Sequence, residues 1–432
     1  MTPITIETIL AHSKARGEPD WLANRRADAW RIFEATPPPT RSDEEWRRTD
    51  LSWMDWSDIY PSAPQLLNDS TAELLPPHLS QASIVLVEHG VDTTVVQVKP
   101  DAEAAGITAE SLSTAAGSSN RLVENHLATS LVTPTTGKFE ALNSALWTGG
   151  AFVHIPAGIQ LEAPIVILAT SNGPAAYPRT LIIADPGSSA HIVEWWQPDG
   201  SKSPQFANGS TELFVNNDAQ LSYTHVQQWG PKTRGVLSQH ARVAHDASMV
   251  STNVTLGGIF HKGSIKATLS EPGAEVRLNG LSYLDAQQFV DHHTVQDHQT
   301  TDAMSDLLYV NILDNTSRSV YAGSIVVAQD AQRSNAYQRN RNLMLQSGPR
   351  ADSIPRLEIM ADDVRCTHGS TTSTIDPVQL YYLNSRGLDY DAALTLIVDG
   401  TLEPVLDRIP NTVVAEAVRS AVQAKRRSGP ST

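Results

Sequence analysis

A repeat of about 28 residues, a length typical of stacked structural units, constrains the fold of this chain more than any other feature of its sequence. A small or turn-favouring residue followed by alanine recurs between β-rich segments. The alanines are Ala190, Ala219, Ala247, Ala274, Ala303 and Ala331, and the interval from each to the next is nearly constant. Such a period indicates stacked units that share one core, because each unit alone cannot bury its apolar face.

The phase of the repeat predicts how the strands pair. Because the β-rich segments recur at one phase, strands should pair in parallel from one coil to the next. A tight Asp or Gly corner followed by alanine suits a bend where neighbouring coils approach closely. The repeat therefore predicts a mainly β protein with a parallel β-helix core. A β-sandwich in which these dipeptides recur by chance is the alternative.

The segments on either side of the repeat are predicted to be helical. Apolar residues follow a helical spacing over residues 3–35, and a run of prolines follows directly. A helical pattern returns after Thr374. We therefore expect an N-terminal helical or mixed domain (1–135), the β-helix core (136–375) and a C-terminal helical domain (376–432).

Three helices are predicted in the C-terminal domain. Asp376-Pro377 supplies an N-cap residue and a first-turn proline, and Arg386-Gly387 ends this first helix. The second helix is predicted over 391–398, before Gly400, and the third over 411–425. These helices would cap the last coil, present an apolar face to a partner, or do both.

Composition narrows the classes of function. The 432 residues include 32 basic and 47 acidic residues, a net charge of −15, which argues against general nucleic-acid binding and against adhesion to anionic lipid. No segment reads as a membrane span or a signal peptide, so we expect no membrane association and a cytoplasmic location. The single cysteine, Cys366, excludes an intramolecular disulfide and any cluster held only by cysteines of this chain.

The only cysteine lies two residues before a histidine, in the segment VRCTHGS. In a strand, positions i and i+2 share a face, so Cys366 and His368 would point the same way, about 6–7 Å apart. A sulfur and an imidazole nitrogen together are ligands for zinc, copper or iron, and Arg365 would favour the thiolate. A structural cysteine beside an incidental histidine is the alternative reading of the spacing.

A second polar cluster, FVDHHTVQDHQT, contains Asp291, His292, His293, Asp297 and His298. As a strand, it would place Asp291, His293 and Asp297 on one face. His292 and His298 would lie on the other face, about 20 Å apart. A shared metal would need ligands from neighbouring coils, so a polar face of the β-helix or an interface is the favoured interpretation.

Several motifs in the C-terminal third occur together in a fixed order. They are Gln332, Asn335, Gln338, Asn340, Asn342, Leu357-Glu358-Ile359, Cys366-Thr367-His368-Gly369, Tyr382-Leu383 and Ser385-Arg386-Gly387. From about Asp291 to Gly400 this pattern resembles the SufB/SufD family of iron–sulfur cluster assembly proteins, and Leu142–Ile167 and EEWRRTD upstream are similar to it as well. Ser370 to Ser373 depart from the Ala-Thr-Val-Gly that commonly follows His-Gly in the family.

The resemblance implies a right-handed parallel β-helix and a role in a scaffold complex. The helical, tryptophan-containing N-terminal region and the low cysteine content look more like SufD than SufB. A SufD-like chain would pair with a SufB-like paralogue through the β-helix, and its C-terminal helices would bind a SufC-like ATPase. A nascent cluster would be built at the interface between the paralogues. The resemblance implies that His368 acts at this interface, with Cys366 in the companion position.

Ligand number limits what this chain can hold alone. A [4Fe–4S] cluster usually takes four ligands, mainly thiolates, so any cluster or iron near Cys366 must be transient, shared or completed by another chain. We therefore expect no stable cofactor and no turnover chemistry in the isolated chain, which could also form a homodimer. The alternatives are a purely structural partner, a SufB-type paralogue and a carbohydrate-active β-helix enzyme; the last is disfavoured because no export signal is recognised.

Overall fold

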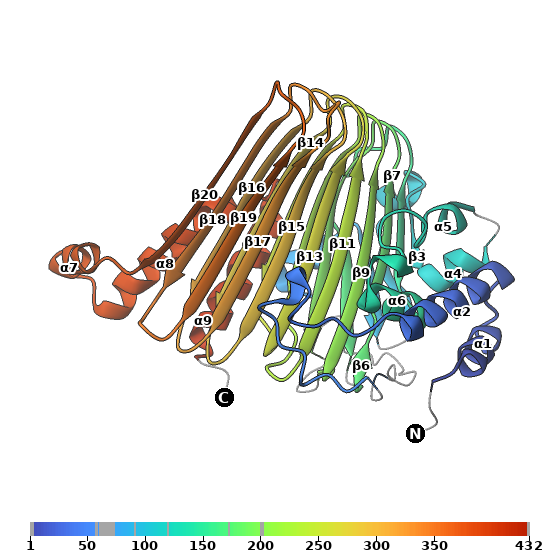
Figure 1. The fold of residues 1–432 in the computed structure, drawn as a ribbon, viewed down its shortest axis with the longest axis horizontal. Helices are drawn as coiled ribbons and strands as arrows, with labels where there is room; N and C mark the ends of the chain where they lie inside the picture. Colours follow the sequence, from blue (N-terminus) through green and yellow to red (C-terminus); the bar gives the residue numbers. More distant parts are fainter. Residues whose placement is uncertain are drawn as a thin grey trace.

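Two long sheets form a flattened tube in the computed structural model, which describes residues 4–56, 59, 74–89, 92–118, 121–171, 173–198 and 203–429 (Figure 1). Sheet A contains, in spatial order, β2 (Asp92–Val98), β1 (Ile84–His89), β5 (Ile165–Ser171), β8 (Ser189–Pro198), β10 (Gln220–Gln227), β12 (Ser248–Thr255), β14 (Glu275–Leu284), β16 (Met304–Leu313), β18 (Asn335–Met344) and β20 (Arg365–Thr374). Sheet B contains β3 (Thr108–Ser111), β4 (Ala151–Ile155), β7 (Arg179–Ala184), β9 (Phe206–Val215), β11 (Arg234–Val243), β13 (Phe260–Leu269), β15 (Phe289–His298), β17 (Arg318–Val327) and β19 (Arg350–Ile359), and the short β6 (Ala175–Ala176) pairs with β9.

The chain passes from one sheet to the other at every turn. From β7 to β20 successive long strands alternate between sheet B and sheet A, and each pairs in parallel with the strand one coil earlier. Only β1–β2 and β3–β4 are antiparallel among the described pairs. This arrangement confirms the predicted parallel β-helix and excludes the β-sandwich. Strands β1, β2 and β3 show that residues before 136 also contribute to the two sheets.

The predicted corners explain the repeat in physical terms. Asp218, Asp246, Gly273 and Asp302 all have φ between 51° and 76°, and the alanine after each is fully buried. Short polar residues and glycine tolerate this left-handed conformation best. At Gly273 a Cβ atom would also collide with the carboxylate of Asp246 in the preceding coil. Small residues recur because neighbouring corners touch.

Two of the six alanines do not occupy this corner. Ala190 lies within β8 and pairs with Leu221, so the matching corner is Gly187-Ser188. Ala331 lies in a longer connection, and the pairing of Met304 with Asn335 makes Ser334 the equivalent of Ala303. The coils at both ends of the repeat are therefore longer than the middle coils, to which the regular period belongs. The prediction was wrong at both ends because the dipeptide does not mark the corner there.

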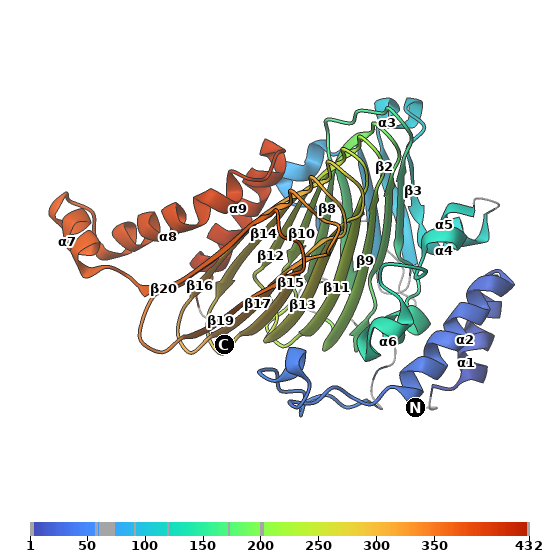
Figure 2. The same cartoon turned by 45° about the horizontal axis from the view of Figure 1, so that its top comes forward.

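Helices flank the tube at both ends of the chain. In order they are α1 (Ile6–Ala15), α2 (Asp20–Ala35), η1 (Glu44–Trp46), η3 (Pro77–Gln81), α3 (Pro100–Ala104), α4 (Leu112–Gly117), α5 (Arg121–His126), η4 (Pro134–Thr136), α6 (Lys138–Leu146), α7 (Pro377–Ser385), α8 (Tyr390–Leu406) and α9 (Thr412–Arg427). Figure 2 shows the C-terminal helices over one face of the tube and the N-terminal segment along the opposite face. Among the described residues, none of these helices is long and apolar enough to cross a membrane.

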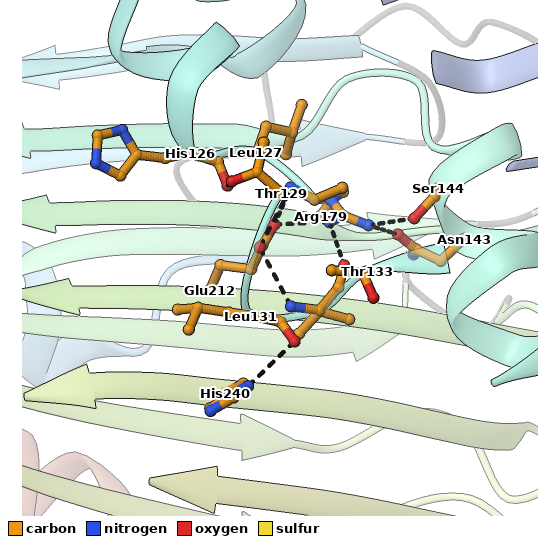
Figure 3. A network of polar contacts seen from close by, with 12 residues as sticks. His126, Leu127, Thr129, Leu131, Thr133, Asn143, Ser144, Arg179, Glu212 and His240 are labelled. Atoms are coloured by element: carbon orange, nitrogen blue, oxygen red, sulfur yellow. Dashed lines mark hydrogen bonds and ion pairs between the residues drawn. The ribbon is translucent and has the colours of Figure 1, made fainter. Parts of the chain in front are cut away.

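The N-terminal region covers the outer face of sheet B. The outward rings of Phe206, Phe214 and Phe260 join a buried cluster with residues of α2 and α6. Figure 3 shows the polar network beside this cluster, in which Arg179 and Glu212 form a fully buried ion pair with an N···O distance of 2.6 Å. The network ties residues 126–144 to the sheet.

Helices α8 and α9 cover the outer face of sheet A. Val398, Leu402 and Val405 of α8 and Val414 and Val418 of α9 are buried in one cluster with outward residues of β10 to β18. The first and third predicted helices are confirmed, including the Asp376 N-cap that accepts from Val378 N–H. The predicted end before Gly400 is wrong, because α8 continues to Leu406 and buries its second half against the sheet. Burial here outweighs the low helix propensity of Gly400 and Pro404.

Candidate functional site

The tube is open at its C-terminal end. Strands β19 and β20 are the last strands of sheets B and A, and each pairs with only one neighbouring strand, β17 or β18. In Figure 1 β20 lies at the end of the tube opposite the N-terminal helices. We call β19, β20 and the connection between them the rim. Within the described part of the chain, no segment pairs with the outer edges of these two long strands.

Cys366 and His368 both lie on β20 and point along the interior of the tube. Cys366 packs against an interior cluster that includes Ile325, Val327 and Ala336. Because alternate residues of a strand share a face, His368 points to the same side as Cys366. The structure bears out the strand on which this prediction depends, because β20 pairs with β18 without a register shift, and His368 is exposed where the tube ends.

Hydroxyl side chains extend this row along β20. Ser370 and Thr372 follow His368 at alternate positions, and both are exposed. On the opposite strand, the inward residues Leu357 and Ile359 are each 37% exposed. The rim is therefore polar along β20 and apolar along part of β19, with its inward side chains open to solvent.

The expected effect of Arg365 on the cysteine is wrong. Partial burial raises the pKa of the Cys366 thiol, and the hydrogen bond with the Ala336 backbone only partly opposes this rise. Arg365 lies on the other face of β20, because neighbouring residues of a strand point in opposite directions. The thiol is therefore the favoured form of Cys366 in the isolated chain.

The side chains of the FVDHHTVQDHQT cluster lie on two faces of β15, as the sequence predicts. His292 and His298 point into the tube and are buried. On the outer face, Asp291 binds Lys262 at 2.8 Å and His293 at 3.0 Å. Burial alone would raise the pKa of Asp291, but the charges and hydrogen bonds of Lys262 and His293 together outweigh it and hold this pKa below its ordinary value.

These ion pairs hold the N-terminal segment on sheet B. Lys262 also donates to the backbone oxygen of Glu45, and Thr49 hydrogen-bonds with Asp291. Further along, Arg356 of β19 binds Glu44 at 2.6 Å. The segment thus reaches the rim. No group of three or more His, Cys, Asp and Glu side chains suited to a metal ion occurs in the part of the chain that the structure describes.

The sequence interpretation missed a polar stripe inside the tube. The imidazoles of His261 and His292 have ring centroids 5.7 Å apart, and the next ring towards the rim, Tyr309, lies 5.6 Å from His292. Burial lowers the pKa of His292 to about 4, so it is neutral near pH 7. His261 and His292 both occupy inward positions of their strands. The alternation of residues within each strand is visible in the sequence, but which of its two faces points inward is known only from the register of the strands.

The stripe continues to the rim as a ladder of amides. Asn311 donates to Asn342 at 2.9 Å, and Asn342 in turn donates to Asn340 at 2.8 Å and to the Thr372 hydroxyl at 3.2 Å. Gln338 and Asn340 pair in register with His368 and Ser370. Three members of the Gln/Asn series, Gln338, Asn340 and Asn342, therefore lie directly beneath the exposed side chains of β20. Gln332 precedes β18, and Asn335 is exposed on its other face.

Most of the chain matches one known protein family. Residues 166–401 match the family model described as "SUF system FeS cluster assembly, SufBD core domain", and residues 11–167 match "SufBD protein N-terminal region". An iron–sulfur cluster assembly SufBD family protein of Synechocystis is 28% identical over 94% of this chain and 91% of its own length. A SufBD family protein of Staphylococcus epidermidis is 25% identical over 96% of this chain and 92% of its length, and one of Staphylococcus aureus is 25% identical over 94% and 90%.

A parallel β-helix with an open, histidine-bearing end and helices on both outer faces defines the structural class. The match to the core model covers more than half of the chain. The chain therefore belongs to the SufBD family of iron–sulfur cluster assembly proteins.

Proposed function

We propose that this chain is a SufD-like subunit of a cytoplasmic SufB–SufC–SufD scaffold complex and contributes His368 to a nascent iron–sulfur cluster. One observation carries this proposal: the inward-pointing imidazole of His368 is exposed at the open end of the tube. An exposed imidazole nitrogen can bind iron without first losing a buried contact. Family membership supplies the class of substrate, which is iron or a cluster in assembly.

The rim supports a SufB-like paralogue as the partner. The two long unpaired strand edges present rows of backbone donors and acceptors, which natural proteins cover or block. The exposed apolar residues Leu357, Ile359 and Met360 lie on the same rim. A second β-helix docked here would continue both sheets and bring its own ligands beside His368. Cys366 is the second ligand we propose, and it would need to lose its proton on binding.

The C-terminal helices support a second partner, a SufC-like ATPase. Helix α7 buries none of its residues, and Val378, Tyr381 and Tyr382 are 73%, 74% and 55% exposed. Large exposed apolar residues grouped on one short helix are typical of a docking surface. In Figure 1 α7 projects beyond the tube, where a partner can reach it.

The chain itself would have no turnover chemistry. A thiol and an imidazole do not complete the four-ligand set of a cluster, so assembly needs the partner. ATP hydrolysis by the docked ATPase would supply the free energy for rearranging the interface. An incomplete site would also let the finished cluster leave.

Substitution of His368 tests the proposal. The chain is co-expressed with its paralogue and the ATPase of its own organism, and the complex is purified without oxygen. His368→Ala should lower the bound iron and sulfide at least tenfold while the three proteins still co-elute. His245→Ala is the matched control, because His245 is an exposed histidine at a corner remote from the rim.

A purely structural subunit is the competing function. The raised pKa of Cys366 favours it, because a protonated thiol is a poor ligand. If His368→Ala leaves iron and sulfide at the wild-type level in an intact complex, the structural reading replaces the ligand role.

A further inference from the structure

We infer that Gln338 is a positioning residue for His368: its free amide oxygen accepts the second imidazole N–H when His368 binds a metal ion. This inference rests on the proposed ligand role of His368. Gln338 lies on β18, pairs in register with His368 of β20, and faces the interior of the tube. Neighbouring strands of a sheet are about 4.8 Å apart, so the two side chains stack in one column.

The amide of Gln338 is half satisfied in the structure. Its Nε2 donates to the backbone oxygen of Gly323 at 3.3 Å, which fixes the orientation of the amide group. The side chain is only 1% exposed, and its Oε1 atom is buried without a hydrogen-bond partner among the residues that the structure describes. A buried amide oxygen without a partner is destabilising, because it has lost its hydrogen bonds to water and gained none in the fold. Such an atom needs an explanation, and the residue directly above it in the column is His368.

The surrounding chain keeps space for this amide. A Cβ atom on Gly323 would collide with the Gln338 amide and the Tyr321 hydroxyl, so the glycine leaves room for the amide where it now lies. The neighbouring amides Asn340 and Asn342 have hydrogen bonds of their own, to Tyr309 and Thr372 respectively. Within this row of amides on β18, Gln338 alone leaves its oxygen free among the described residues.

The chemistry of metal-bound histidine matches this arrangement. A ligating imidazole usually donates its other ring N–H to a carboxylate or carbonyl oxygen, which fixes the tautomer and the ring direction. Ser370 and Thr372 cannot take this role for His368 as readily, because they lie beside it on the same strand rather than beneath it. Loss of such a partner typically lowers metal affinity 10–100-fold.

Three substitutions isolate the acceptor. Gln338→Met keeps the length of the side chain and removes the oxygen, whereas Gln338→Glu keeps an oxygen acceptor. Gln239→Met is the matched control, because Gln239 is also buried, also uses its Nε2 for one hydrogen bond and also has an unpartnered Oε1, but lies four coils from the rim. Each variant is purified in the complex, and thermal unfolding confirms that it is folded.

Binding of iron(II) added alone under argon is the measurement. Gln338→Met should weaken the affinity 10–100-fold. Gln338→Glu should retain it within about threefold, and Gln239→Met should not change it. Wild-type iron(II) affinity in folded Gln338→Met, or an equal loss of affinity in Gln338→Met and Gln338→Glu, would overturn the role of Gln338 but leave the ligand role of His368 standing. If His368→Ala also binds iron(II) like the wild type, the proposed ligand role fails as well, so the two failures are distinguishable.

Discussion

The buried ion pair between Arg179 and Glu212 holds the N-terminal region on the β-helix, and breaking it has a predictable effect. Arg179 donates to Asn143, Ser144 and the backbone oxygen of Val132 as well as to Glu212. Glu212 also accepts from the backbone N–H groups of Ala128 and Val132. Both charged side chains are fully buried. Figure 3 shows these groups converging from sheet B and from residues 126–144.

Arg179→Met should lower the free energy of unfolding by about 3–5 kcal/mol. The substitution leaves the Glu212 carboxylate buried with only two backbone donors, and an uncompensated buried charge is strongly destabilising. The double variant Arg179→Met/Glu212→Leu removes both charges. It should therefore be more stable than Arg179→Met, because replacing both partners by apolar residues is often neutral.

Urea unfolding followed by tryptophan fluorescence and by circular dichroism measures these changes. Five of the nine tryptophans lie at or before Trp56, so fluorescence reports release of the N-terminal region. Arg31→Met is the control, since its pair with Asp28 is exposed and should contribute less than about 1 kcal/mol. A loss below about 1 kcal/mol in Arg179→Met, or a double variant less stable than the single one, would refute the reasoning.

Two further predictions concern acid stability and partner docking. Burial lowers the pKa of His292 and of His298 to about 4, whereas an unfolded histidine titrates near 6.5, so the unfolded chain binds more protons as the pH falls through this window. Each of these histidines should remove about 1.4 kcal/mol of stability per pH unit between about pH 6.5 and 4. Urea unfolding at pH 7, 6 and 5 should show that the free energy of unfolding of His292→Gln falls less steeply with falling pH than that of the wild type. An equally steep fall would contradict the lowered pKa of His292. Val378→Asp/Tyr381→Asp should weaken ATPase capture at least about 30-fold in pull-down titrations while unfolding changes by less than about 0.5 kcal/mol. Val96→Asp, at an exposed apolar position on β2, is its control, and equal capture by both variants would reject α7 as the docking helix.

The β-helix could be predicted because its corners impose a local rule. Four coils share an Asp or Gly in the left-handed region followed by a buried alanine, and this pattern is visible in the sequence. The end coils escaped the rule because serine replaces the alanine at both corners, in Gly187-Ser188 at one end and after the left-handed Arg333 at the other. The repeat therefore identifies a corner in the sequence only where few residue types can form that corner.

Features that depend on contacts between distant segments could not be predicted. The continuation of α8 through Gly400 depends on burial of Leu402 and Val405 against sheet A. The N-terminal contribution to the sheets depends on β1 pairing with β5, which follows much later in the chain. Neither the helix contact nor the strand pairing can be inferred from the local pattern of residues.

The candidate site was half predictable for a related reason. The i, i+2 relation of Cys366 and His368 follows from strand geometry alone, whereas the state of the thiol depends on what covers it. Arg365 is adjacent in sequence but lies on the opposite face, and the interior cluster around Ala336 determines the pKa instead. The role of Gln338 likewise emerges only from the register, because it lies a full coil before His368 in the sequence.

The rim joins two requirements of an assembly scaffold in one surface. Its long strand edges are unpaired among the described residues, and in the proposed function its inward side chains would need a partner to complete a ligand set. A partner that pairs with β19 and β20 would necessarily place its own last coil over His368 and exclude water from the site. Any motion that separates the edges would expose the same ligands again. In the proposed complex, therefore, closing the interface and completing the cluster site are one event, and control of that interface by an ATPase would control cluster release.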